Sequence, residues 1–207
     1  MISTNSYGFN LTPEINFYKS ILSELSVVVD VGCRCDNIFY ELNSNLEIHL
    51  FEPMTTKDIV NFGESLKNIP NVHFNNYGLS SKNEIKEFYL EYTSLSTDWH
   101  KYLNRDKTST MLEFRTLYDY ILEKNIEKID LLKIDTESWD FEVIKGCKEK
   151  IWDIPYIQFE YGWKTYGDSD TVEDIYDYFS GYNIYDIGGS PKNYVITKKT
   201  LNYPKIK

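Results

Sequence analysis

The stretch SVVVDVGCRCDNIFYEL, Ser26–Leu42, decides how this chain is expected to fold. Its run of valines, interrupted by Asp30, is typical of a strand that is buried on both faces. Gly32 follows that strand at a point where a tight turn, or a close approach of the backbone to another group, needs a residue without a side chain. Asp36 and Asn37 then offer an N-cap for a helix that carries the apolar residues after them. The stretch therefore predicts a strand, a turn and a helix, which is how an α/β sheet begins.

Length, charge and composition narrow the possible functions. The 207 residues suit a single domain, and we expect residues 1–207 to form one. The net charge is −10 and the lysines are scattered, so no nucleic-acid partner is expected. No apolar run approaches the roughly 20 residues that span a bilayer, so no membrane association is expected. With three cysteines and no apolar leader, the sequence predicts a cytoplasmic protein, and it indicates no oligomeric state.

Strand-like and helical segments alternate along the chain, after an N-terminal helical extension over residues 1–25. This alternation predicts a mostly parallel sheet with helices on both faces. After the first strand, strand-like runs occupy residues 47–52, 71–77, 129–135, 156–161, 182–187 and 193–198. Helical patterns occupy residues 37–43, 55–67, 116–124, 140–150 and 172–179.

Two segments interrupt this alternation. Residues 85–92, IKEFYLEY, alternate well enough to predict an additional strand. Residues 93–110 are polar, rich in Ser and Thr and without a period, so they predict a long loop. Loops of that length in a compact domain are more often functional than decorative, and we expect this one to serve as a lid over an acceptor pocket.

Polar residues or glycine stand at the ends of five predicted strands. A single acid in such a place is as easily a helix cap, but ligands of open α/β sheets bind beyond the carboxyl ends of the strands. The whole set therefore predicts one shared ligand site. Its members are Asp30 and Gly32, Glu52, Asn76 and Tyr77, Asp135 and Glu137, and Glu160.

The acids favour one kind of ligand. Glu52 follows Asp30 by about 20 residues, the spacing at which an acidic residue accepts hydrogen bonds from ribose hydroxyls. An acid at the end of the first strand would repel a pyrophosphate, so it does not favour a dinucleotide. It suits a cofactor with a cationic amino-acid end, such as S-adenosylmethionine, whose ammonium group needs an anionic or carbonyl partner.

Five motifs resemble, in order and spacing, the FkbM family of S-adenosylmethionine-dependent O-methyltransferases. They are VVVDVGCRCD, HLFEP, FRTLYDYI, IDLLKIDTESWDFEVIKG and YIQFEYG, which together cover about Val27–Gly162. The segment LLKIDTESWDFEVIKG is the most specific of them. The resemblance implies a Rossmann-like class I methyltransferase fold, with a mostly parallel seven-stranded sheet, helices on both faces and an antiparallel last strand.

The resemblance also implies how the cofactor is bound. Asp30 and Gly32 would line the methionine end of S-adenosylmethionine. Glu52 would hold the ribose. The segment around Asn76 and Tyr77 would flank the adenine.

The remaining residues are the candidates for catalysis. The resemblance implies that Asp135 and Glu137 face the transferred methyl group and the acceptor, so that Asp135 also contacts the cofactor. An acceptor hydroxyl must lose its proton, for which Asp135, Glu137, Glu160 and His100 are candidate bases. Alternatively, Asp135 and Glu160 hold a divalent metal such as magnesium that acidifies the hydroxyl. The sequence leaves both routes open, and we assign no metal ligands. The predicted acceptor is a small molecule or a sugar or glycan unit.

Some residues depart from the family pattern or invite another interpretation. The first motif usually reads D-V-G-A-N-x-G, whereas here Cys33 and Cys35 stand in its middle and Asp36 replaces the last glycine. Two cysteines without a nearby histidine do not complete a metal site, so packing beside the cofactor is the better interpretation. His49 and His73 lie within predicted strands, and we expect both to be structural.

Two other functions stay open. The altered first motif favours a methyltransferase fold that no longer catalyses and serves as a binding or regulatory module. A nicotinamide-dependent reductase would share the alternation of strands and helices and an acid at Glu52. It should also show a glycine-rich loop, which this sequence lacks.

Overall fold

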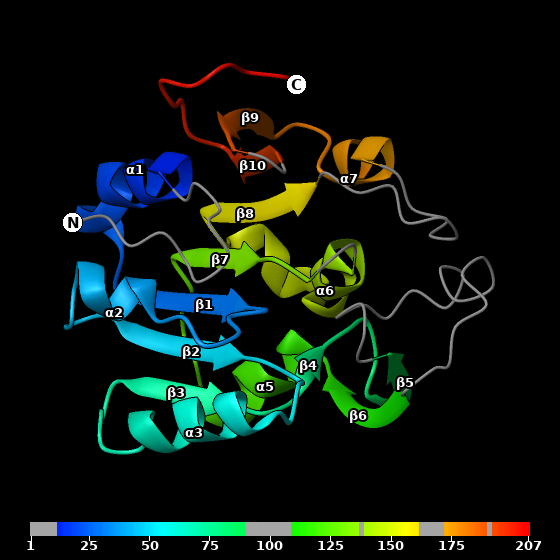
Figure 1. Cartoon of the computed structure of the whole chain (residues 1–207). Coiled ribbons are helices and arrows are strands. Elements are labelled where there is room, and N and C mark those ends of the chain that lie inside the picture. Colours follow the sequence, from blue (N-terminus) through cyan, green and yellow to red (C-terminus); the bar gives the residue numbers. More distant parts are fainter. Residues whose placement is uncertain (1–11, 90–108, 137–138, 162–171, 190–191) are drawn as a thin grey trace.

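The computed structural model describes residues 12–89, 109–136, 139–161, 172–189 and 192–207. A seven-stranded sheet forms the centre of the molecule, with helices on both of its faces (Figure 1). In spatial order its strands are β3 (Val72–Asn75), β2 (Glu47–Phe51), β1 (Val27–Val31), β7 (Leu131–Ile134), β8 (Tyr156–Tyr161), β10 (Lys192–Thr197) and β9 (Asn183–Gly188).

The pairing of these strands is mostly parallel. β1 pairs in parallel with both β2 and β7, β2 pairs in parallel with β3, and β7 pairs in parallel with β8. The last strand of the chain, β10, lies between β8 and β9 and is antiparallel to both. The predicted α/β class, the seven strands and the antiparallel last strand are therefore confirmed.

Each face of the sheet buries its own hydrophobic cluster because successive side chains of a strand point to opposite faces. Val28 of β1 belongs to the cluster under one set of helices, whereas Val29 and Val31 belong to the cluster under the other. The first set is α1 (Thr12–Ile21), α2 (Ile38–Leu42) and α3 (Lys57–Leu66). The second set is α5 (Leu117–Lys124), α6 (Asp140–Gly146) and α7 (Val172–Tyr178).

A second, smaller sheet consists of β4 (Gly78–Leu79), β6 (Ser109–Arg115) and β5 (Glu84–Tyr89), in that order. It lies on the side toward which β1 and β2 point (Figure 1). The additional strand predicted within residues 85–92 is present as β5, which pairs with β6 in antiparallel fashion. β6 was not predicted, and it takes in Ser109 and Thr110 at the end of the predicted loop. Residues 93–108 lie outside the described part of the chain.

Two helix N-termini differ in their capping, and one of them contradicts a prediction. Thr116 caps α5, because its Oγ1 accepts a hydrogen bond from the N–H of Asp119 at 3.1 Å. Asp36 does not cap α2: the N-cap position is Asn37, which makes no side-chain capping bond. The reason is that the turn is longer than expected, since the N–H of Asp36 still donates to the carbonyl of Cys33.

The described part of the predicted N-terminal extension is helical. α1 ends at Ile21 and is followed by a 3₁₀ turn, Leu22–Glu24, while residues 1–11 lie outside the described part. None of the helices described here is long and apolar enough to cross a membrane.

Candidate active site

Strand register places five of the predicted site residues along one edge of the main sheet. Val31 of β1 is the register partner of Phe51 in β2 and of Ile134 in β7. Phe51 pairs in turn with Asn75, and Ile134 with Phe159. The residues that come next in the chain therefore lie side by side at the carboxyl edge: Gly32, Glu52, Asn76, Asp135 and Glu160.

Gly32 makes the turn after β1, and a side chain does not fit in its place. Its φ is +83°, in the left-handed region that favours glycine. A Cβ on this residue would lie 1.8 Å from the carbonyl oxygen of Asp135. The N–H of Gly32 donates to the carbonyl of Phe51 at 2.9 Å. The turn is thus held against the ends of both neighbouring strands, and its backbone is left uncovered by any side chain of its own.

The carboxylate of Glu52 holds the loop that follows this turn. Its Oε2 accepts a hydrogen bond from the N–H of Arg34 at 3.0 Å, and its Oε1 accepts one from the N–H of Met54 at 2.9 Å. Burial raises the pKa of Glu52, and the two backbone bonds oppose that rise because they favour the carboxylate. Arg34 has a φ of +51°, which is uncommon for a residue with a side chain. Glu52 therefore keeps the divergent loop in an unusual conformation.

Asp30 lies within β1 and pairs with Lys133, its register partner in β7. Lys133 Nζ is 2.9 Å from Asp30 Oδ1, and the two side chains are 12% and 1% exposed. Burial raises the pKa of Asp30, while Lys133 opposes the rise. Burial also acts to lower the pKa of Lys133, but the carboxylates around it, Asp30 foremost, raise it overall. The two residues therefore form a buried, charged pair just below the edge.

A buried polar network links α1 to this part of the sheet. Gln158 of β8 donates hydrogen bonds to Glu14 of α1 at 3.3 Å and to Asn193 of β10 at 2.6 Å. It accepts one from the hydroxyl of Tyr18 at 2.8 Å. Burial raises the pKa of Glu14 to about 7; the charge of Lys133 opposes that rise, and nearby carboxylates add to it. Sequence reasoning missed Glu14 because its segment was interpreted only as an extension that precedes the sheet.

Asn76 and Tyr77 lie beyond the end of β3. Asn76 Nδ2 donates to the carbonyl oxygens of Glu52 and Met54, both at 2.7 Å, and so ties the ends of β2 and β3 together. The ring centroid of Tyr77 is 5.6 Å from that of Phe51. Burial raises the pKa of Tyr77 to about 12, so its hydroxyl stays protonated near neutral pH.

The structure describes two of the three candidate catalytic acids. Asp135 follows β7, is half-buried, and its N–H donates to the carbonyl of Val31 at 2.9 Å. Glu160 lies near the end of the neighbouring strand, β8, and is also half-buried. Glu137 lies outside the described residues. The structure thus brings Asp135 and Glu160 to adjacent strand ends.

The edge has features that fit a cofactor lying close to the backbone. Gly32 packs so closely against the end of β7 that a Cβ would overlap the carbonyl oxygen of Asp135, and without a side chain its turn leaves the loop backbone accessible. Thr136 Oγ1 and Asn37 Oδ1, in the loops after β7 and β1, are buried and have no hydrogen-bond partner in the described structure. Since buried polar atoms normally have a partner, these two atoms can serve polar groups of a ligand.

The strand order, with an antiparallel strand inserted next to the edge strand β9, defines a class I methyltransferase fold. Sequence comparison identifies the family within this class, because the family model of the methyltransferase FkbM domain matches residues 27–184. The chain therefore belongs to the FkbM methyltransferase family, as its motifs predicted, and this membership implies the use of S-adenosylmethionine.

Solved structures support the same fold. Methyltransferase FkbM from Methylobacillus flagellatus is similar with a TM-score of 0.57 and 13% identity, over 84% of this chain and 44% of that one. Monomeric WbdD is similar with a TM-score of 0.53 and 12% identity, over 94% of this chain and 42% of that one. At such identities the likeness concerns the fold alone, and this chain spans less than half the length of either protein. No curated protein sequence matches the chain.

Proposed function

We propose that this chain is an O-methyltransferase that transfers the methyl group of S-adenosylmethionine to a hydroxyl of a small molecule or of a sugar unit in a glycan. The observation that carries the proposal is the row of residues at the carboxyl edge, in which the bare backbone of Gly32 lies against the end of β7. Ligands of open α/β sheets bind at this kind of edge.

Each cofactor-binding role rests on a group at this edge. Gly32 allows the methionine part of S-adenosylmethionine to approach the backbone, with Asp30 and its partner Lys133 beneath it. Glu52 is the proposed ribose acceptor, because each carboxylate oxygen that already accepts one backbone N–H has a further lone pair. The segment of Asn76 and Tyr77 is proposed to flank the adenine.

The proposed catalytic residues are Asp135, Glu160 and Glu137. The cofactor supplies an activated methyl group when it is bound, so the protein has mainly to position the acceptor and to remove its proton. Asp135 and Glu160, at adjacent strand ends, are placed to orient a hydroxyl and accept its proton. The same two carboxylates could hold magnesium, which would acidify the hydroxyl, since magnesium prefers oxygen ligands. Glu137 keeps the role that the sequence motif suggests.

The two other functions are less well supported. Dinucleotide-binding sheets of the Rossmann type are parallel, with the strand order 3-2-1-4-5-6. The antiparallel β10 between β8 and β9 departs from that pattern, which speaks against a nicotinamide-dependent reductase. A non-catalytic module is favoured by the altered loop at Cys33–Asp36, but the turn at Gly32 and the anchoring of that loop by Glu52 both persist.

The experiment is a transfer assay with methyl-labelled S-adenosylmethionine and a panel of sugars, glycans, phenols and capped RNA. Label should enter a hydroxyl of a sugar, glycan or phenol, and mass spectrometry should locate a single added methyl group. Labelled RNA, with sugars and phenols unlabelled, would contradict the proposed acceptor class. An arm that contains EDTA separates the two routes, because only a magnesium-assisted reaction loses its activity there.

A further inference from the structure

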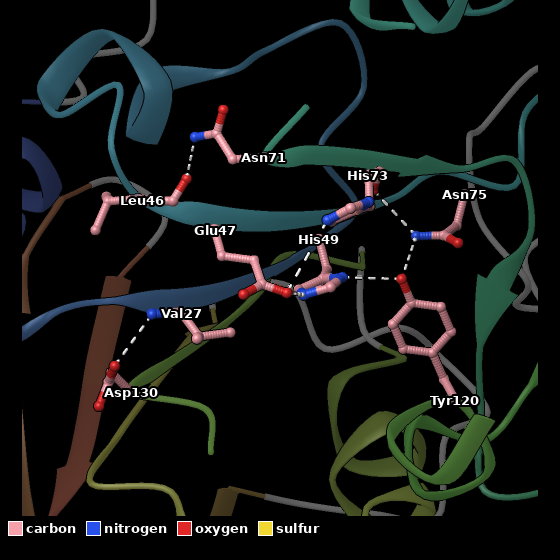
Figure 2. Close-up of polar contacts among 9 residues, drawn as sticks. All are labelled: Val27, Leu46, Glu47, His49, Asn71, His73, Asn75, Tyr120 and Asp130. Carbon is pink, nitrogen blue, oxygen red and sulfur yellow. Dashed lines mark hydrogen bonds and ion pairs between the residues drawn. The ribbon is translucent and has the colours of Figure 1, made fainter. Parts of the chain in front are cut away.

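A second group of side chains that can bind a metal lies near the amino-terminal ends of β2 and β3, away from the carboxyl edge. Glu47 and His49 of β2 and His73 of β3 each direct one ligand atom toward the others, and these atoms all lie within 4.8 Å of one another. Figure 2 shows the carboxylate and the two imidazole rings gathered between β2, β3 and α5. No other such group of three is found among the residues described.

The convergence follows from strand geometry. Glu47 and His49 are two positions apart on β2, so their side chains point to the same face of the sheet. His73 is the register partner of His49 on the neighbouring parallel strand. The two imidazole rings stack, with centroids 4.8 Å apart and planes inclined by 20°. Fixed backbone positions in two hydrogen-bonded strands therefore hold all three groups together.

Tyr120 of α5 orients the buried histidine. Its hydroxyl lies 2.9 Å from His49 Nδ1, and Asn75 Nδ2 donates to the same hydroxyl at 3.3 Å. His49 Nε2 therefore points in the opposite direction, toward Glu47 Oε1 at 3.1 Å (Figure 2). A metal-binding histidine normally donates the N–H of its non-coordinating ring nitrogen to a fixed polar partner. The Tyr120 hydroxyl offers such a partner to His49 Nδ1, which leaves Nε2 as the atom directed into the group of three.

We propose that Glu47, His49 and His73 form a binding site for a divalent transition-metal ion of the zinc type. Two imidazole nitrogens and one carboxylate suit zinc and its neighbours, whereas magnesium and calcium prefer oxygen ligands alone. The site pins β3, an edge strand of the main sheet, to β2.

One ligand distance already fits a tetrahedral site, whereas His73 must move closer to Glu47. Bonds of about 2.0–2.1 Å at tetrahedral angles put ligand atoms about 3.3 Å apart. His49 Nε2 and Glu47 Oε1 are 3.1 Å apart, and His73 Nε2 and Glu47 Oε1 are 4.0 Å apart. The side chains of Glu47 and His73 are 48% and 44% exposed, so they can rotate inward, an ion can enter, and water can supply the fourth ligand.

The alternative is an ordinary hydrogen-bonded network in which His49 Nε2–H donates to Glu47 and no ion is bound.

The test is a calorimetric titration of the full chain, freed of metal by a chelator, with zinc chloride. A parallel titration with cobalt chloride is followed by visible absorption, which reports the coordination geometry. We expect one ion per chain and a tetrahedral cobalt spectrum. His73→Gln and Glu47→Gln should each weaken binding about tenfold or more, since each removes a ligand. Both side chains are half-exposed, so circular dichroism should show the fold retained in both variants.

A control variant shares the chemistry but not the position. Glu64→Gln removes an exposed carboxylate of α3 and should not alter zinc affinity. Wild-type protein that binds neither ion at millimolar concentration would overturn the proposal. Wild-type affinity in either His73→Gln or Glu47→Gln would overturn it as well, because zinc would then be bound elsewhere, for example by the exposed Cys35.

Discussion

Lys133 and Asp30 face each other across β7 and β1, with Nζ and Oδ1 2.9 Å apart and almost no exposure to solvent. The acid that the sequence singled out at the first strand is therefore already paired inside the sheet. The positive charge that balances Asp30 comes from Lys133. This lysine belongs to the segment LLKIDTE, part of the motif that is most specific to the family. The two motifs are thus physically coupled by a pair that lies within β1 and β7, next to the carboxyl edge.

Breaking this pair should destabilise the protein. Lys133→Met leaves Asp30 buried without its cation, and removal of one partner of a buried pair typically costs about 3–5 kcal/mol in the free energy of unfolding. Urea denaturation measures that cost. Asp30→Asn in the same chain should recover part of it, since no uncompensated charge then remains. If the double variant instead shows the sum of the two single losses, the residues do not interact as described.

Glu14 should make stability depend on pH. Its pKa rises from an ordinary value of 4.5 to about 7 on folding. The stabilisation that comes from protonated Glu14 is therefore complete below about pH 4.5 and is lost as the pH rises through about 7. Glu14→Gln cannot ionise. Its free energy of unfolding should therefore rise above that of the wild type between about pH 5 and about pH 8, by up to ~3 kcal/mol.

Denaturation curves of both proteins at several pH values measure this gain. Glu64→Gln is the matched control, because that carboxylate is exposed in its ion pair with Lys67. A difference between Glu14→Gln and the wild type that is constant across this pH range would show that Glu14 is not buried as an acid.

Gly32→Ala should impair cofactor binding more than it impairs folding. The new Cβ would meet the carbonyl oxygen of Asp135 at 1.8 Å, so the ends of β1 and β7 must move apart. We expect an affinity for S-adenosylmethionine about tenfold lower or worse, which corresponds to about 1.4 kcal/mol. Gly181→Ala is the control, since Gly181 has a similar φ of +92° but nothing within 4 Å of its Cβ position. Equal affinities in the two variants would remove Gly32 from the site.

Asp135→Asn should abolish turnover while cofactor affinity stays nearly intact. We expect this split because the contact of Asp135 with the reacting groups matters mostly in the transition state. Transfer of labelled methyl groups gives the rate, and calorimetry gives the affinity. Asp177→Asn, on the exposed surface of α7, serves as the control. Normal turnover in Asp135→Asn would move the catalytic role to Glu160 or Glu137.

Much of the fold was predictable because its strands are apolar runs bounded by glycine and polar residues. The valines of β1 and the row at the carboxyl edge follow from such local patterns. β6 was missed because STMLEFR follows a long polar stretch and alternates only weakly. β6 forms a strand because it pairs with β5 and β4, and such pairing cannot be predicted from its local sequence.

The strand-end positions of the candidate site residues were predictable from the sequence, but the contacts among their side chains were not. The strand ends indicated where Gly32 and Glu52 lie. The pairing of Asp30 with Lys133, and the reach of Glu14 from α1 to Gln158, depend on side chains that are far apart in the sequence and meet only in the folded protein. His49 and His73 were interpreted as structural for the same reason, because their proximity to Glu47 arises only from the register of β2 and β3.

The central claim, that S-adenosylmethionine binds at this edge, is tested most directly by calorimetric titration of the wild-type chain with S-adenosylmethionine, S-adenosylhomocysteine and NADH. The account predicts saturable binding of one molecule of either sulfur compound per chain, and no binding of NADH. A folded protein that gives no heat with S-adenosylmethionine or S-adenosylhomocysteine, or that binds NADH instead, would contradict it.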